Sequence, residues 1–85
     1  MGNETWDLWV DFHRVDAKGL THASLKDARA GVRVEPSAYL VVGDDDAEPA
    51  VAEVVKVEAN EVVLLRVLPG TVEAHRDLVS SSRRR

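Results

Sequence analysis

The chain has 85 residues, a formal net charge of −4, a hydrophobic content of 45% and no cysteine. This length accommodates one small domain, and the absence of thiols excludes disulfides and thiolate zinc sites. The hydrophobic content excludes a disordered chain, and no apolar run reaches the ~20 residues of a transmembrane helix. The N-terminus lacks the basic and apolar regions of a secretory signal, which predicts a cytoplasmic protein with no membrane partner.

The charge distribution argues against a nucleic-acid partner. Arginines 83–85 supply three of the eleven cations, so the rest of the chain carries −7. Binding to a duplex normally draws most of its affinity from the neutralisation of phosphates. We therefore expect a protein partner or a second copy of the chain, as in a homodimer. The three arginines are either a tail for an anionic partner or a terminal feature without a role.

Residues 5–15 alternate between apolar and mainly polar side chains, which is typical of a half-buried strand. The predicted core face holds Trp6, Leu8, Val10 and Phe12. The opposite face holds Asp7, Trp9, Asp11 and His13. Residues 1–5 before this strand are expected to form a flexible tail.

The next segments alternate between turns and short elements. Residues 16–19 predict a turn, and residues 20–30 show no strand pattern. Ser24 either caps a short helical turn that ends before Gly31, or the segment is an extended loop. Two short strands are then predicted, at residues 32–34 and 38–42.

Residues 49–68 predict a β-hairpin, with valine-rich strands at 51–57 and 62–68 around a turn. Alternation places one set on one face: Val55, Val57, Val63, Leu65 and Val67. The other face receives Ala52, Val54, Val62, Leu64 and Leu68, together with Lys56 and Arg66. Two apolar faces predict either a sheet that closes into a barrel or a contact with another subunit.

Pro69 and Gly70 end the hairpin, and Thr71 is placed to cap a helix over residues 72–79. Val72, Leu78 and Val79 are its candidates for packing against an open end of the barrel. The polar residues 80–85 are expected to be a disordered tail. The domain would then span residues 6–79.

These elements predict an all-β fold, a small partly open five-stranded barrel with a short C-terminal helix. The element list resembles barrels of the Src-homology type. The run GVRVEPSAYLVVGDDDAEPAVAEVVKVEANEVVLLRVLPG resembles short β proteins of unassigned role from actinobacteria. The resemblance covers about residues 32–78 and implies a fold, but no activity, cofactor or site.

The chain shows no catalytic constellation. Its serines lie outside a nucleophile-elbow pattern, and its glycines are scattered singly, unlike a phosphate-binding loop. Neither a catalytic residue nor a cofactor is therefore predicted. Residues 44–46 with Glu48 predict an acidic turn, because they lack the spaced ligands of an EF-hand.

Metal binding is the one chemical function for which the sequence offers candidate residues. Asp11 and His13 lie two apart on one predicted strand, so they would project from the same face, and His22 or His75 could add a third ligand. The alternative is that both are ordinary solvent-facing residues of a half-buried strand.

Trp9 falls on the polar face of the first predicted strand, where it either anchors an interface or is covered by residues 20–30. In the interface reading, an acidic, aromatic patch of Trp9, Asp7, Asp11, His13 and Tyr39 would suit a basic protein segment. The predicted function is a non-catalytic binding or assembly module. The alternatives are a nucleic-acid-associated small barrel and a metal-binding protein that uses Asp11 and His13.

Overall fold

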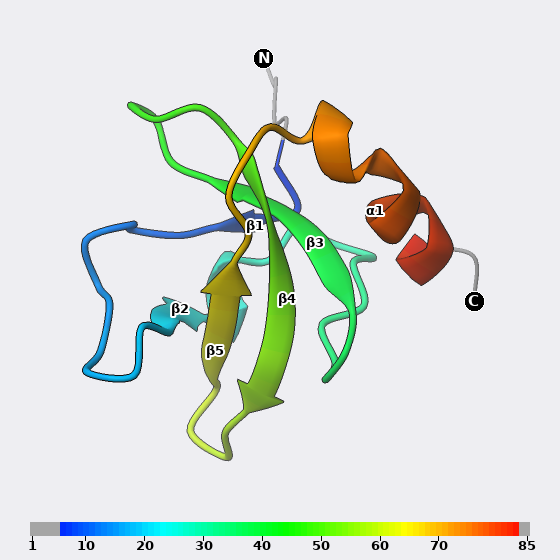
Figure 1. The fold of residues 1–85 in the computed structure, drawn as a ribbon. Helices are drawn as coiled ribbons and strands as arrows, with labels where there is room; N and C mark the ends of the chain where they lie inside the picture. The colour runs from blue at the N-terminus through cyan, green and yellow to red at the C-terminus, as the bar shows by residue number, and fades with distance from the viewer. Residues whose placement is uncertain (1–5, 84–85) are drawn as a thin grey trace.

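A computed structural model describes residues 6–83 and has the predicted all-β architecture (Figure 1). Five strands form one sheet: β1 (Leu8–Trp9), β2 (Thr21–Ser24), β3 (Tyr39–Gly43), β4 (Ala50–Val57) and β5 (Val62–Val67). The helical elements are the 3-10 turns η1 (Leu25–Asp27) and η2 (Glu73–His75) and the helix α1 (Arg76–Arg83). Within the described residues, no helix is long and apolar enough to cross a membrane. The tail predicted at residues 1–5 lies outside this range.

The sheet curls into a nearly closed barrel. Its strand order is β1-β3-β4-β5-β2, with β1 parallel to β3 and the other neighbours antiparallel. An isolated bridge joins Leu8 of β1 to Ala28, just after η1, and the amide of Arg29 donates to the carbonyl of Asp7 at 2.8 Å. The two ends of the sheet therefore meet at β1, which confirms the small-barrel prediction.

The predicted hairpin is the longest part of the sheet. Between β4 and β5, the amide of Glu58 donates to the carbonyl of Val62 at 2.8 Å, and Glu61 takes a positive φ of 69°. The carbonyl of Glu58 accepts from the amide of Glu61 at 2.9 Å, which closes the turn. Valine-rich strands around a short polar turn thus form the hairpin that the sequence predicts.

The predicted division of the hairpin into two faces is wrong. Ala52 and Val54 were assigned to the face opposite Val63 and Leu65, but all four lie in one buried cluster. Val54 pairs with Leu65 in the antiparallel register, so their side chains share a face. A bulge between residues 54 and 56 then shifts the alternation, and Val57 packs against the same cluster.

The N-terminal strand is much shorter than predicted. Only Leu8–Trp9 pairs in the sheet, and a turn follows in which the amide of Arg14 donates to the carbonyl of Asp11 at 3.0 Å. The predicted inward residues nevertheless point inward, with Leu8 and Val10 fully buried and Phe12 packed against them. Trp6 packs instead against a second cluster outside the barrel.

Two further predictions between residues 20 and 34 are corrected. Residues 21–24 form β2, although their side chains gave no strand pattern, because they pair along β5. Residues 32–34 are not a strand; Val32 and Val34 pack against the core from a loop. The helical turn after Ser24 is confirmed as η1, and the Ser24 hydroxyl accepts from the amide of Lys26 at 3.2 Å.

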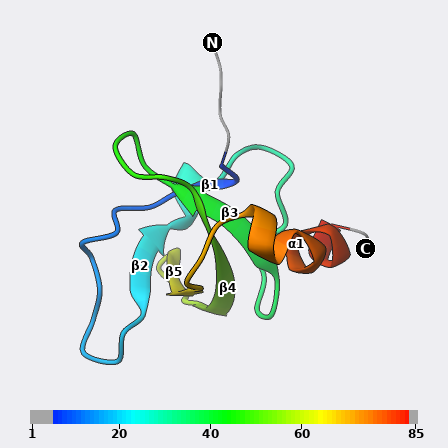
Figure 2. The ribbon, with the colours of Figure 1, turned by 45° about the horizontal axis from the view of Figure 1, so that its top comes forward.

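The C-terminal helix covers the outside of the sheet and does not plug the end of the barrel, as Figures 1 and 2 show. Val79 of α1 joins Val41 and Val51 in the second buried cluster, and Val72 and Leu68 pack against it. The Thr71 hydroxyl accepts from the amide of Ala74 at 3.2 Å, as expected of a cap. The helix continues to Arg83, so the predicted disorder of residues 80–83 is wrong, and residues 84–85 lie outside the described range.

We predict that Leu65→Ala lowers the free energy of unfolding by about 2–5 kcal/mol, because Leu65 is fully buried at the centre of the barrel. Urea denaturation followed by circular dichroism measures the change. Val15→Ala is the control, because Val15 is 49% exposed, and its effect should stay within about 0.5 kcal/mol. Equal effects of the two substitutions would contradict the assignment of the core.

Candidate functional site

Asp7 is the first predicted interface residue, and the structure places it in the interior. Its exposure is 2%, although the alternation assigned it to the solvent face. Its Oδ1 accepts from Nη2 of Arg29 at 2.7 Å, and its Oδ2 accepts from the amide of Val41 at 3.0 Å. Its own amide donates to the carbonyl of Val41 at 2.7 Å. Asp7 therefore joins β3 to the segment after η1 and offers no charge to a partner.

Trp9 is at the surface, and the reading in which residues 20–30 bury it is wrong. It is 38% exposed, while its neighbour Leu8 is fully buried. In the parallel pair of β1 and β3, Trp9 lies beside Gly43, the last residue of β3. The acidic turn of residues 44–46 starts at the next residue. An exposed indole thus lies where the chain leaves the sheet into a run of carboxylates.

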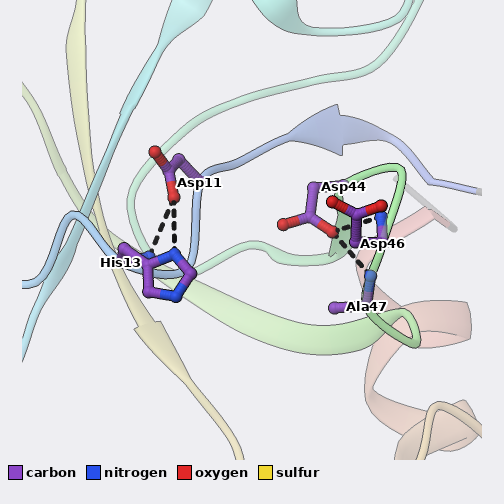
Figure 3. Close-up of polar contacts among 5 residues, drawn as sticks. All are labelled: Asp11, His13, Asp44, Asp46 and Ala47. Atoms are coloured by element: carbon purple, nitrogen blue, oxygen red, sulfur yellow. Dashed lines mark hydrogen bonds and ion pairs between the residues drawn. The ribbon is translucent and has the colours of Figure 1, made fainter.

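Asp11 and His13 do meet, but in a turn and not along a strand. The Oδ1 of Asp11 accepts from the amide of His13 at 3.0 Å and lies 3.4 Å from Nδ1 of the same histidine (Figure 3). The aspartate is only partly exposed, and the His13 side chain is 95% exposed. The pair closes its own turn, which is the ordinary use of an aspartate at such a position.

The histidines proposed as third metal ligands lie elsewhere. His22 contacts Asp16, with 2.9 Å between Nε2 and Oδ2, and Nε2 of His75 lies 2.7 Å from the carbonyl of Pro69. Among residues 6–83, no group of three histidine or carboxylate side chains is arranged to hold a metal ion. The structure thus does not assemble the ligand set that the metal reading needs.

The acidic turn after β3 organises its own backbone. The Oδ1 of Asp44 accepts from the amides of Asp46 at 2.9 Å and Ala47 at 2.7 Å (Figure 3). Asp45, Asp46 and Glu48 are exposed. This is the acidic β-turn that the sequence predicts, and its remaining carboxylates face solvent beside β1.

Tyr39 does not lie beside Trp9. It is at the opposite end of β3 from Gly43, four residues away, a separation of about 13 Å along a strand. Tyr39 is half-buried against the cluster under α1, and it lines a depression of about 320 Å³ with Leu78. The predicted patch is therefore divided, with Asp7 inside the protein and Tyr39 under the helix.

A pocket that the sequence did not predict lies along the outer edge of β2. It has a volume of about 370 Å³ and is lined by His13, Arg14, Val15, Asp16 and His22. Backbone contacts hold its two sides together, because the amide of His22 donates to the carbonyl of Arg14 at 2.9 Å and Val15 bridges to Thr21. The signal available in the sequence was an aspartate that opens a predicted turn with a histidine six residues later.

The pKa of the Asp16 carboxyl in this pocket is lowered from its ordinary value. The contact with His22 is the largest cause that lowers the pKa of the Asp16 carboxyl, and the bond from the amide of Leu20 to Oδ1 lowers it further. Oδ1 accepts from Lys18 at 2.8 Å and from Leu20 at 3.0 Å. Asp16 is therefore an ionised acceptor that closes the turn and orients the imidazole of His22.

Comparison of the chain with protein-family models, with curated proteins and with solved structures gives no match. The resemblance to Src-homology barrels and to actinobacterial β proteins therefore stays a prediction.

We predict that Asp7→Ala lowers the free energy of unfolding by about 2–4 kcal/mol. The substitution leaves the buried amide of Val41 without its acceptor and removes the partner of the half-exposed Arg29. Urea denaturation measures the loss. Asp45→Ala, in the exposed turn, is the matched control and should change stability by less than about 0.5 kcal/mol. A variant as stable as the control would show that Asp7 does not close the barrel.

We also predict that the Asp16 carboxyl titrates below the ordinary value of 3.8, and that His22→Ala raises its pKa toward that value. Because the folded-state pKa is the lower one, the stabilisation is complete above the unfolded pKa and is lost as the pH falls through the folded pKa. Carbon-detected NMR of the aspartate carboxyl signals measures both values. An unchanged Asp16 titration in the variant would contradict the contact.

Proposed function

We propose that this protein is a cytoplasmic, non-catalytic binding module whose partner is a basic segment of another protein. The contact surface is the Trp9 edge, which comprises Trp9, Asp11, His13 and the acidic residues Asp44, Asp45, Asp46 and Glu48. The single observation that carries the proposal is the 38% exposure of Trp9 beside this acidic turn.

Tryptophan at a surface is a common anchor of protein interfaces, because its large ring buries much area with little loss of conformational freedom. Besides Trp9, Val15 is the only large hydrophobic residue exposed among residues 6–83. The other tryptophan, Trp6, packs over Gly43, where an added Cβ would lie 3.3 Å from its ring. The exposure of Trp9 is thus specific to its position.

The negative charges around Trp9 favour a positively charged partner. Residues 44–48 carry four carboxylates, three of which belong to residues with exposed side chains. The Oδ1 of Asp44 is used by the turn, whereas Asp45, Asp46 and Glu48 make none of the ion pairs found among the described residues. Unpaired surface carboxylates attract lysine and arginine and repel phosphates. A basic protein segment therefore fits this edge better than nucleic acid.

The structure gives less reason for self-association than the two apolar faces of the hairpin gave in the sequence. The outer face of β4 no longer requires a second subunit along its whole length, because α1 covers Val51 with Val79. Val55, Val62 and Leu64 are intermediate in exposure without belonging to either cluster. A homodimer through these residues remains the second assembly to test.

The test begins with an array of short lysine- and arginine-rich peptides, followed by fluorescence-anisotropy titration of the tightest one. We expect Trp9→Ser to weaken binding by at least about tenfold, because an interface anchor contributes roughly 2 kcal/mol or more. Val15→Ser removes the other exposed hydrophobic residue outside the edge and should leave the affinity unchanged.

Peptides with glutamate in place of each cation control for charge and should not bind. Equal affinity of wild type and Trp9→Ser would exclude the Trp9 edge. Binding to RNA or DNA that weakens with salt would instead favour the nucleic-acid-associated barrel. Light scattering after size exclusion tests the homodimer separately, and a monomer at high concentration would exclude it.

A further inference from the structure

We propose that the pocket along β2 binds a tetrahedral oxyanion, a phosphoryl group in its free or monoester form, through Arg14 and His22. This inference does not rest on the proposed function, and the pocket shares only His13 with the Trp9 edge. The inference rests on an arginine that has no carboxylate partner among residues 6–83 and that lines the same pocket as a histidine oriented by Asp16.

Arg14 differs from the other arginines whose side chains are described. Arg29, Arg33, Arg66 and Arg76 each lie within 4.0 Å of a carboxylate, whereas Arg14 makes no ion pair among residues 6–83. Its backbone is fixed, because its carbonyl accepts from the amide of His22 at 2.9 Å. The guanidinium is thus an available donor set on a fixed stretch of backbone, and its planar geometry matches phosphate oxygens.

His22 is the second donor. Asp16 is an ionised acceptor, so the Nε2 of His22, at 2.9 Å from Oδ2, carries the proton of that contact. A protonated histidine also carries a hydrogen on Nδ1. In that protonated form, Nε2–H is held by Asp16 and Nδ1–H is the donor that remains for an anion. His13 also lines the pocket, and its side chain is almost fully exposed.

The carboxylate of Asp16 lies in the pocket, but its hydrogen bonds reduce its repulsion of a bound anion. Both oxygens of Asp16 are engaged, Oδ1 with the amides of Lys18 and Leu20 and Oδ2 with His22. A carboxylate that accepts several hydrogen bonds has its charge offset locally. The nearest other acid along the chain, Asp11, is turned toward the backbone of His13.

The geometry favours an anion over a metal ion, the other ligand that histidines suggest. Asp16, His22 and His13 line one pocket, yet no group of three such side chains is arranged for a metal within residues 6–83. The cation in this pocket comes from the protein itself, as Arg14, so the complementary ligand is an anion. The volume of about 370 Å³ accommodates a phosphoryl group with a small organic substituent.

The experiment is an NMR titration of the ¹⁵N-labelled chain at a pH of about 6, because an ordinary histidine is mostly protonated at that pH. The probes are inorganic phosphate and O-phosphoserine, with sodium chloride at matched ionic strength as the reference. We expect saturable shifts confined to the amides of residues 13–16 and 22, with a dissociation constant in the millimolar range, because the site is open to solvent. Tighter binding of O-phosphoserine would identify a monoester as the ligand, and equal binding would identify the phosphoryl group alone.

Arg14→Gln should weaken binding by about tenfold or more, since charge-assisted hydrogen bonds to the anion are lost. Lys56→Gln removes the same charge from an exposed position on the hairpin and should have no effect. His22→Gln tests the second donor, and the dispersion of each spectrum checks that the variant is folded. Shifts no larger than those in chloride, equal binding by Arg14→Gln, or an equal loss in Lys56→Gln would each overturn the proposal.

Discussion

One buried carboxylate, that of Asp7, links the two ends of the barrel sheet. β1 contributes only Leu8 and Trp9 to the sheet, so only a few backbone contacts join the two ends of the curled sheet there. Asp7 extends that join, because its side chain binds the amide of Val41 on β3 and the guanidinium of Arg29 on the opposite end. An aspartate that is 2% exposed is tolerated because both of its oxygens have donors. The closure in turn fixes which residues of the N-terminal segment face out.

This closure separates the surfaces that carry the proposals. Since pairing ends at Trp9, residues 10–16 leave the sheet, turn at Asp11 and return along the outer edge of β2. Trp9 stays beside the acidic turn after β3, and Arg14 is brought to His22. One short segment therefore contributes Trp9 and Asp11 to the Trp9 edge and, a few residues later, Arg14 to the pocket, where the arginine makes no ion pair within the described part of the chain. The Trp9 edge suits a cation and the pocket suits an anion. This difference comes from the side chains at each site, since the net charge of −4 belongs to the whole chain.

The apolar outer face of the sheet is also explained by packing within the chain. Val41 and Val51 are buried from outside by Val79 of α1, while Leu40, Val42 and Val54 fill the barrel interior. A small barrel has too little interior to bury all the apolar residues of its strands, so a helix over one outer face adds a second cluster. The valine content of β3 and β4 thus serves two cores within one domain. In the sequence, two apolar faces argued for a contact with another subunit. That argument is weaker once the helix is seen to cover one of them.

The sequence by itself determined the elements whose signals are local. The hairpin of β4 and β5, the strand at β3, the capped turn after Ser24 and the inward set Leu8, Val10 and Phe12 follow from alternation and turn residues. Only the tertiary structure decided the rest, because register, bulges and pairing partners depend on residues far apart in the chain. The bulge at residues 54–56 places Ala52 and Val54 on the same face as Val63 and Leu65, and pairing with β5 makes a strand of residues 21–24. In the same way, Asp7 is buried because the Val41 amide and Arg29, each distant in sequence, offer it donors that no period-two pattern can reveal.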